Sequence, residues 1–313
     1  MERYLVTGGA GFIGSHIVET LLKNGHFVRI IDDFDTGQRK NLRDFTGELE
    51  VIEGSIADPK TISKAAESID TIFHEAARGS VPRSVEDPVG THENNVTGTV
   101  MVLEAARKAG VRKVVCASSS SVYGETEELP KRESMEPSPK SPYATSKLAL
   151  EYYVKQYSDV YGLDAVALRY FNVYGPRQNP NLQYAAVVPI FIRNMILNKP
   201  CTIYGDGEQT RDFTYVADCV YANLLAAKTS GISGGVFNIA CAGQITVNEL
   251  FQELKKILNY KLDAVYEPAR AGDIKYSYAD IDLATKRLGF SPQVSLKDGL
   301  NKTVEWYQKE LSS

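Results

Sequence analysis

The amino-acid sequence predicts an α/β fold built on a doubly wound parallel sheet, with a smaller α/β domain beside it. In the first half, apolar runs rich in β-branched residues alternate with helix-like segments, a pattern typical of a sheet covered by helices on both faces. The runs carry apolar residues on both faces, as a buried parallel sheet requires. After residue 174 the alternation loosens and Pro and Gly become frequent before a Gly205-Asp-Gly turn. We interpret this later segment as material inserted between late elements of the sheet.

Each expected element follows from a local signal in the chain. The expected strands are short apolar runs at 4–7, 27–32, 49–53, 71–74, 111–117 and 165–169. The expected helices occupy 12–24, 59–68, 95–109, 142–161, 188–198, 246–259 and 296–311. No internal repeat or low-complexity tract interrupts them.

Composition narrows the class of protein. The chain has 313 residues, of which 43% are hydrophobic and 24% charged, as in an ordinary globular enzyme. A net charge of −4 gives no basic footprint for nucleic acid. No apolar run approaches membrane-spanning length, and residues 1–7 already form the start of a strand, which leaves no room for a signal peptide. We therefore expect a cytoplasmic protein with neither nucleic-acid nor membrane partners.

Cysteine and histidine usage also favours a cytoplasmic protein and indicates no metal site. The four cysteines show no CxxC spacing and indicate no disulfide framework, which fits a reducing compartment. Cys116 lies in an apolar run and is expected to be a small buried hydrophobic residue. The four histidines have no ligand spacing, so we expect no metal site.

A glycine-rich turn lies between the first expected strand and the first expected helix. Residues 8–14 read Gly-Gly-Ala-Gly-Phe-Ile-Gly, which matches GxGxxG from Gly9 and GxxGxxG from Gly8. The glycines allow a tight turn and let backbone N–H groups approach a pyrophosphate at the positive end of the helix dipole. Such a turn can be purely structural, but here strand, turn, helix and second strand stand in the expected order. The sequence therefore predicts a dinucleotide-binding (Rossmann) sheet.

Asp32 ends the second expected strand, where a carboxylate can hold a ribose diol. It favours NAD over NADP, because a carboxylate repels a 2′-phosphate. A turn-forming role beside Asp33 and Asp35 is the plainer alternative. We expect the nearby Arg39 and Lys40 to be solvated, but because their positive charges could accept a 2′-phosphate, NADP is not excluded as the cofactor.

These assignments divide the chain into two parts. Residues 1–173, with return segments near 213–241, are assigned to the NAD-binding Rossmann domain. Residues 174–212 and 242–313 are assigned mainly to a substrate-binding domain.

Tyr143 and Lys147 form a YxxxK pair near the start of the expected helix 142–161. The i, i+4 spacing puts both side chains on one helix face. A free tyrosine has a pKa of about 10, too high for an efficient base at neutral pH, and a nearby ammonium and an oxidised nicotinamide lower it. In isolation this spacing usually marks a surface pair, but its position well after the glycine turn favours catalysis.

Four serines, Ser118 to Ser121, follow the apolar strand 111–117, whose carboxyl end should face the cofactor. A hydroxyl there can hydrogen-bond a reacting oxygen and relay its proton. The alternative is a polar strand end without chemistry, and spacing alone does not select one of the four serines.

These motifs resemble the extended short-chain dehydrogenase/reductase family, and within it the UDP-glucose and UDP-N-acetylglucosamine 4-epimerases. The resemblance covers nearly the whole chain, through the segments 7–14, 118–124, 141–147, 168–175, 205–213 and 270–273. It implies that Tyr143 is the base, that Lys147 is its electrostatic partner, and that Ser119 is the proton-relaying hydroxyl. It also implies NAD as cofactor, a UDP-sugar as substrate, and a homodimer formed through the helices near 95–109 and 142–161.

The resemblance further implies two sets of binding residues. The cofactor set comprises Gly8, Gly11, Phe12, Ile13, Gly14, Asp32, Ile56, Ala76, Asn95, Tyr143 and Lys147. The substrate set comprises Gly79, Ser80, Ser119, Ser120, Tyr143, Asn172, Gln178, Arg211, Arg270, Asp273 and Ser277. Asn172 is expected on the UDP side, and Arg211 and Arg270 are expected to clamp the diphosphate with planar guanidinium groups. Two positions depart from the family pattern: Ser55 replaces an aspartate that contacts adenine, and Arg78 replaces an apolar residue.

The reaction implied is redox-neutral inversion of C4 through a 4-keto sugar. A 4,6-dehydratase would carry an Asp-Glu pair where this chain has Ser120 and Ser121, which disfavours dehydration. A UDP-glucuronate or UDP-pentose 4-epimerase stays open, as does a catalytically silent dinucleotide-binding regulator.

Substrate size is predicted from one position. In the resembling epimerases, the fourth residue after the Arg-x-Gly-Asp aspartate borders the sugar pocket, and a large aromatic there crowds a 2-acetamido group. Here that residue is Ser277, and Gly79 and Gln178 agree with a roomy pocket. We therefore expect activity on UDP-GlcNAc and UDP-GalNAc as well as on UDP-Glc and UDP-Gal. An ordinary strand residue is the plainer interpretation of Ser277.

Overall fold

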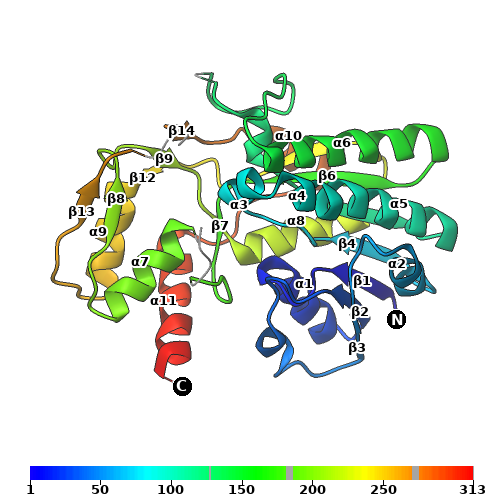
Figure 1. Cartoon of the computed structure of the whole chain (residues 1–313), viewed down its shortest axis with the longest axis horizontal. Coiled ribbons are helices and arrows are strands. Elements are labelled where there is room, and N and C mark those ends of the chain that lie inside the picture. Colours follow the sequence, from blue (N-terminus) through cyan, green and yellow to red (C-terminus); the bar gives the residue numbers. More distant parts are fainter. Residues whose placement is uncertain (127, 181–185, 270–274, 313) are drawn as a thin grey trace.

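A computed structural model describes residues 1–126, 128–180, 186–269 and 275–312. Its main sheet has seven parallel strands in the order β11-β6-β5-β4-β1-β2-β3 (Figure 1). These strands are β1 (Arg3–Thr7), β2 (Phe27–Asp32), β3 (Leu49–Glu53), β4 (Thr71–His74), β5 (Lys113–Ser119), β6 (Ala165–Tyr170) and β11 (Val236–Ile239). The predicted parallel sheet is confirmed.

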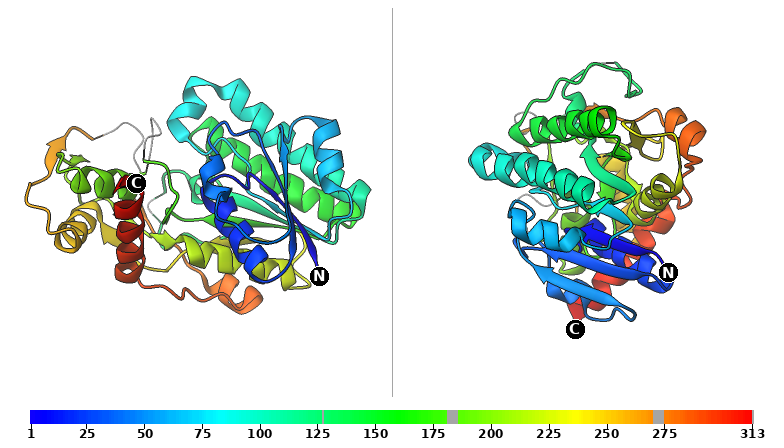
Figure 2. Two further views of the ribbon diagram at one scale, coloured as in Figure 1. Left: turned by 90° about the horizontal axis from the view of Figure 1, so that it is seen from below. Right: turned by 90° about the vertical axis from the view of Figure 1, so that its right-hand side faces the viewer.

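Helices cover both faces of this sheet. One face packs on α1 (Phe12–Lys23), α8 (Val216–Lys228) and α10 (Asp282–Leu288). The other packs on α2 (Pro59–Ala66), α5 (Gly98–Ala109) and α6 (Pro142–Tyr161). Figure 2 shows the sheet between these two layers. The doubly wound arrangement follows from strands that are apolar on both faces.

The ends of α6 illustrate how local sequence sets the helices. Ser141 is the N-cap and accepts a hydrogen bond from the Ala144 N–H, and Pro142 occupies the first turn. Gly162 ends the helix with φ +68°, a left-handed conformation that glycine adopts without strain. The catalytic pair predicted from the sequence therefore lies in the first two turns of a well-capped helix.

The expected helix 95–109 begins differently from the prediction. Residues Glu93–Thr97 form a π-helical turn, and the α-helix α5 starts only at Gly98. The Asn95 amide faces the segment after β4, with Oδ1 accepting from the Arg78 N–H at 2.8 Å. A turn of this kind re-aims a side chain, and such turns recur at functional sites.

A smaller unit lies beside the sheet, at the left of Figure 1. Its core packs α7 (Val187–Ile196), α9 (Val247–Ile257) and α11 (Leu296–Ser312) together. Its short strands are β7 (Val173–Tyr174), β8 (Thr202–Tyr204), β9 (Thr210–Arg211), β10 (Thr214–Tyr215), β12 (Ile245–Thr246), β13 (Val265–Glu267) and β14 (Tyr276–Ser277). Strands β12, β9 and β14 form a three-stranded sheet, and β7 with β10 and β8 with β13 form pairs.

Two short helices, α3 (Val81–Glu86) and α4 (Pro88–His92), follow β4 and pack on α6. No helix within the described ranges is long and apolar enough to cross a membrane.

Candidate active site

The glycine turn joins β1 to α1 at the carboxyl edge of the sheet. Gly8 has φ +68°, and a Cβ on it would lie 2.8 Å from the backbone of Ala76. A Cβ on Gly14 would lie 2.2 Å from the Gly8 carbonyl oxygen. These contacts require glycine at both positions, because a Cβ on Gly8 would push the turn away from the segment after β4 and a Cβ on Gly14 would separate the helix from the turn.

The amino end of α1 fits a phosphate group. Gly11 is the N-cap of the helix, and no side chain in the described part of the chain caps it. The first-turn N–H groups, which include those of Phe12 and Ile13, therefore point toward the end of the helix where the dipole favours an anion. The backbone around Gly8–Gly14 thus fits a dinucleotide pyrophosphate.

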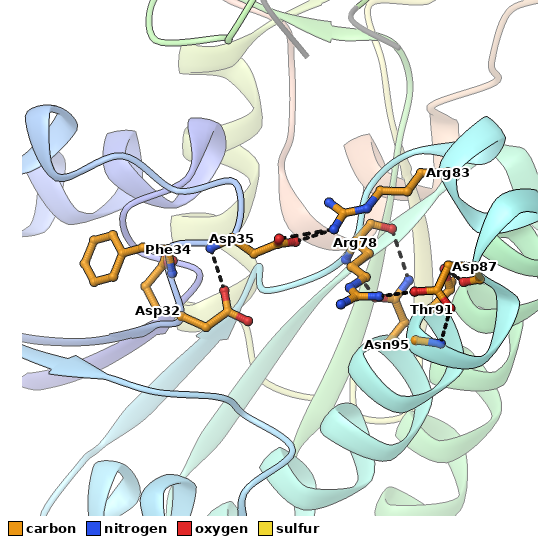
Figure 3. Close-up of polar contacts among 10 residues, drawn as sticks. Asp32, Phe34, Asp35, Arg78, Arg83, Asp87, Thr91 and Asn95 are labelled. Carbon is orange, nitrogen blue, oxygen red and sulfur yellow. Dashed lines mark hydrogen bonds and ion pairs between the residues drawn. The ribbon is translucent and has the colours of Figure 1, made fainter. Parts of the chain in front are cut away.

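Asp32 lies at the end of β2 and is 6% exposed. Its carboxylate accepts a hydrogen bond from the Phe34 N–H at 2.9 Å (Figure 3) and another from the Ala10 N–H, also at 2.9 Å. Burial raises the pKa of Asp32, and the two backbone N–H donors oppose that shift. The turn-forming interpretation of Asp32 is thus supported, and it is compatible with a carboxylate that contacts a ribose.

The other expected cofactor residues lie at the same edge. Ile56 is buried and packs against Gly98, where a Cβ would lie 2.6 Å from it. Asn95 is 2% exposed, and its Nδ2 donates to Ser146 Oγ at 3.0 Å and to the Arg78 carbonyl at 3.3 Å. Asn95 therefore ties the segment after β4 to α6.

Ser119, Tyr143 and Lys147 are brought together from β5 and α6. A side-chain hydrogen bond with Ser119 lowers the pKa of Tyr143, but burial raises it by more, so the net direction is upward. The Lys147 ammonium lies 6.0 Å from the centre of the Tyr143 ring and donates to the Ala117 carbonyl at 2.7 Å. The lowered tyrosine pKa that the sequence predicts is not seen in this structure, because desolvation of the phenol outweighs the favourable contacts.

The structure distinguishes the four serines that spacing could not. Ser118 Oγ donates to Glu151 at 2.5 Å, and Glu151 forms a buried ion pair with Arg169 at 2.7 Å. Ser118 therefore belongs to a structural network on the far side of the strand. Ser119 faces Tyr143, and Ser120 and Ser121 begin the 3-10 turn Ser120–Tyr123.

Glu75 is a site residue that the sequence reasoning missed. It directly follows β4, and Tyr170 donates to its Oε1 at 2.7 Å. Burial raises the pKa of Glu75 to about 7, and the nearby positive charge of Lys147 opposes that shift. Burial also lowers the pKa of Lys147 to about 8, with Glu75 opposing. A charged residue at the carboxyl end of a buried strand is the signal that could have identified Glu75.

Four expected substrate residues lie in or next to the short strands of the smaller unit: Asn172, Gln178, Arg211 and Ser277. Asn172 has φ +36° and donates from Nδ2 to the Asp212 carbonyl at 3.0 Å. Arg211 on β9 is paired in register with Ser277 on β14. Gln178 donates from Nε2 to the Val173 carbonyl at 3.2 Å, and its buried Oε1 has no partner among the described residues.

The remaining expected positions differ in what surrounds them. Gly79 is exposed, and a Cβ added to it would have no non-neighbouring atom of the described residues within 4 Å. Ser80 caps α3 by accepting a hydrogen bond from the Arg83 N–H. Arg270 and Asp273 lie outside the described residues. Within the described ranges, no three or more His, Cys, Asp or Glu side chains group to hold a metal ion.

Both departures from the family pattern have local partners. Arg78 Nη1 forms an ion pair with Asp87 Oδ2 at 2.7 Å, which accounts for the charge that the sequence left unassigned (Figure 3). Ser55 Oγ accepts from the Ala57 N–H at 3.1 Å and so stabilises its own turn.

A doubly wound sheet with this glycine turn, and with a serine, tyrosine and lysine grouped at the carboxyl ends of its strands, defines a dinucleotide-dependent enzyme. The model of the NAD dependent epimerase/dehydratase family matches residues 4–240, and the chain belongs to this family. NAD is therefore its cofactor.

The chain is similar to characterised members over its whole length. It is 40% identical over 312 residues to UDP-glucose 4-epimerase of Mycolicibacterium smegmatis, covering 98% of this chain and 99% of that protein. The crystal structure of UDP-glucose 4-epimerase with UDP-glucose from Thermotoga maritima is 41% identical, with a TM-score of 0.94 and 99% of each chain covered. UDP-N-acetylglucosamine 4-epimerase from Methanobrevibacter ruminantium, in complex with UDP-N-acetylmuramic acid, is 40% identical, with a TM-score of 0.95 and 99% of each chain covered.

Proposed function

We propose that this NAD-dependent UDP-sugar 4-epimerase interconverts UDP-GlcNAc and UDP-GalNAc, and also UDP-Glc and UDP-Gal. The observation that carries the proposal is the register between Ser277 and Arg211, which puts a small side chain beside the expected diphosphate clamp. The relatives at about 40% identity include epimerases of both kinds by name, which supports a pocket that admits both sugars.

The grouping of Ser119, Tyr143 and Lys147 supports an acid–base role for the tyrosine. NAD, when bound, would supply the acceptor for the C4 hydride and the donor that returns it. Tyr143 takes the proton of the C4 hydroxyl through contact with Ser119, and it gives a proton back when the opposite face of the 4-keto sugar is reduced. Lys147 holds a positive charge beside the phenol, and that charge stabilises the phenolate.

The acetamido group needs both space and a hydrogen-bond partner. Ser277 and Gly79 are small residues, and in the part of the chain that the structure describes no non-neighbouring atom lies within 4 Å of the place a Gly79 Cβ would occupy. The unpartnered Oε1 of Gln178 is an acceptor suited to an amide N–H. The unsubstituted sugar also fits such a pocket, because extra room excludes nothing.

The test is turnover of a panel of UDP-sugars, with products separated by C4 configuration. Interconversion of both the N-acetyl and the unsubstituted pairs, with the N-acetyl pair at least comparable, supports the proposal. Turnover confined to UDP-glucuronate or UDP-pentoses would replace it with the alternative epimerase. Bound UDP-sugar without any turnover would indicate a silent regulator.

We also propose a cytoplasmic homodimer. Tyr152, Val160 and Tyr161 of α6 are more than half exposed although they are large and apolar, which supports contact through this helix. Light scattering should give the mass of a dimer for the parent protein and a lower mass for Tyr161→Glu. A monomeric mass for the parent would contradict the dimer.

A further inference from the structure

An ion pair joins two segments that are far apart in the sequence. Arg83 Nη2 lies 2.8 Å from Oδ2 and 3.1 Å from Oδ1 of Asp35 (Figure 3). Asp35 lies in the loop after β2, three residues beyond Asp32. Arg83 lies on α3, which follows β4. The pair is therefore a tertiary contact, and neither helix geometry nor a turn accounts for it.

The sheet order shows which part of the fold the ion pair crosses. Strands β2 and β4 are the two neighbours of β1. A contact between the segments that follow them consequently crosses the carboxyl end of β1, where the Gly8–Gly14 turn lies. That turn is the part of the fold that fits the cofactor pyrophosphate.

The two ends of the pair also lie next to the two ends of the cofactor site. Asp35 shares a loop with Phe34, whose N–H donates to the ribose-side carboxylate of Asp32. Next to Arg83, Ser84 Oγ accepts from the backbone N–H of Tyr143 at 3.0 Å. The ion pair thus links the expected adenosine side of the site to α6, the helix that carries Tyr143 and Lys147.

We propose that the Asp35–Arg83 ion pair is a clasp that closes over bound NAD and slows its release. The inference rests on the proposed epimerase function, because an epimerase must keep the reduced cofactor until the hydride is returned to the same sugar. An enzyme that exchanged its cofactor in every cycle would have no use for such a clasp.

The surrounding charges support this assignment. Arg78, the neighbouring guanidinium, has Asp87 as its partner at 2.7 Å and does not compete for Asp35. The side chains of Arg83 and Asp35 are 34% and 39% exposed, so salt screens the pair. A partly exposed pair can open for loading, which a buried one could not do readily.

The experiment measures release of NAD from the purified, NAD-loaded protein in the absence of sugar. Arg83→Glu and Asp35→Lys are each expected to release NAD about three- to tenfold faster, since each replaces attraction by repulsion. The double variant Asp35→Lys/Arg83→Glu is expected to return to within about twofold of the parent. Release from the parent should accelerate with added salt, and more steeply than release from either single variant.

The matched control is Asp282→Lys, which breaks the exposed pair with Lys286 on α10 at the opposite edge of the sheet. It should release NAD at the parental rate, and thermal unfolding of every variant verifies that it is folded. Parental release from both single variants would overturn the clasp. So would a double variant as fast as Arg83→Glu alone, since Arg83 would then act on the pyrophosphate directly. Release without sugar is independent of which sugar is epimerised, so failure here and failure of the proposed substrate are distinguishable.

Discussion

The Tyr170 hydroxyl donates a 2.7 Å hydrogen bond to Glu75 Oε1, and so connects the carboxyl ends of β6 and β4 across β5. Asn223 Nδ2 on α8 donates to the same hydroxyl oxygen at 2.8 Å. The phenol thus gives its single proton to Glu75 while accepting one from Asn223, which orients the whole network. Glu75, with a pKa raised to about 7, lies near Lys147 in the candidate site.

Glu75 should make the stability of the protein fall as the pH rises. Its pKa is raised from 4.5 to about 7 on folding, so between these values the unfolded chain ionises while the folded one does not. The stabilising contribution is full below pH 4.5 and is lost as the pH passes through 7. We expect Glu75→Gln to be more stable than the parent at pH 8 by about 2 kcal/mol and equal to it at pH 5. Urea unfolding midpoints at both pH values measure this, and a constant difference across them would contradict the raised pKa.

Tyr143→Phe should abolish most turnover while leaving the site intact. The substitution removes only the hydroxyl that contacts Ser119, and general acid–base groups contribute about a hundredfold to ten-thousandfold. We expect a loss of that size in turnover, with UDP-sugar binding by calorimetry largely retained. Tyr152→Phe is the matched control, because Tyr152 lies on the same helix but is 62% exposed. Parental turnover in Tyr143→Phe would remove the tyrosine from the mechanism.

Gly14→Ala should weaken cofactor binding through the backbone. The added Cβ would lie 2.2 Å from the Gly8 carbonyl oxygen, so α1 or the turn must shift. Because the shift displaces the N–H groups that we expect to bind the pyrophosphate, the variant should purify with much less NAD than the parent. Gly243→Ala serves as the control, because among residues 1–126, 128–180, 186–269 and 275–312 no non-neighbouring atom lies within 4 Å of the new Cβ. Equal NAD content in the two variants, measured after denaturation, would contradict this account.

The sheet was predictable because its signals are local. The apolar runs, the glycine turn and the helix 142–161 each depend on neighbours in the chain, and the structure has them close to where the sequence predicts them, with β5 shifted to Lys113–Ser119. The seventh strand, β11 (Val236–Ile239), was not among the predicted strands. Contacts between distant segments could not be predicted in this way. Ser118 and Ser119 are adjacent in sequence, yet only packing shows that one bonds Glu151 and the other faces Tyr143.

Electrostatics within the site was the least predictable property. The YxxxK spacing predicts a lysine that lowers the tyrosine pKa, but spacing carries no information about desolvation, which raises it. The partner of Arg78 could not be identified from the sequence for a related reason. Asp87 precedes Pro88 at the start of α4, so its sequence context indicates a helix N-cap and gives no sign of the ion pair with Arg78. Both effects depend on three-dimensional surroundings that a one-dimensional pattern does not contain.

The last prediction concerns the width of the sugar pocket. Ser277 and Tyr276 are consecutive residues of β14, so their side chains point to opposite faces of the small sheet. Tyr276 is 44% exposed, and Ser277 is the less exposed of the two and is paired with Arg211. A bulky residue at 277 should therefore enter the space beside the expected diphosphate clamp, and a bulky residue at 276 should not.

Ser277→Tyr should consequently separate the two substrate pairs. Overfilling a formed pocket costs about 1–3 kcal/mol, so we expect turnover of UDP-GlcNAc to fall at least about tenfold while turnover of UDP-Glc survives. Ser277→Ala removes the hydroxyl without adding bulk, and it should keep the N-acetyl activity if size is the deciding property. A fall with both variants would indicate that the serine hydroxyl binds the sugar. If Ser277→Tyr retains N-acetyl turnover, or if the parent has none, Ser277 does not control access of the acetamido group.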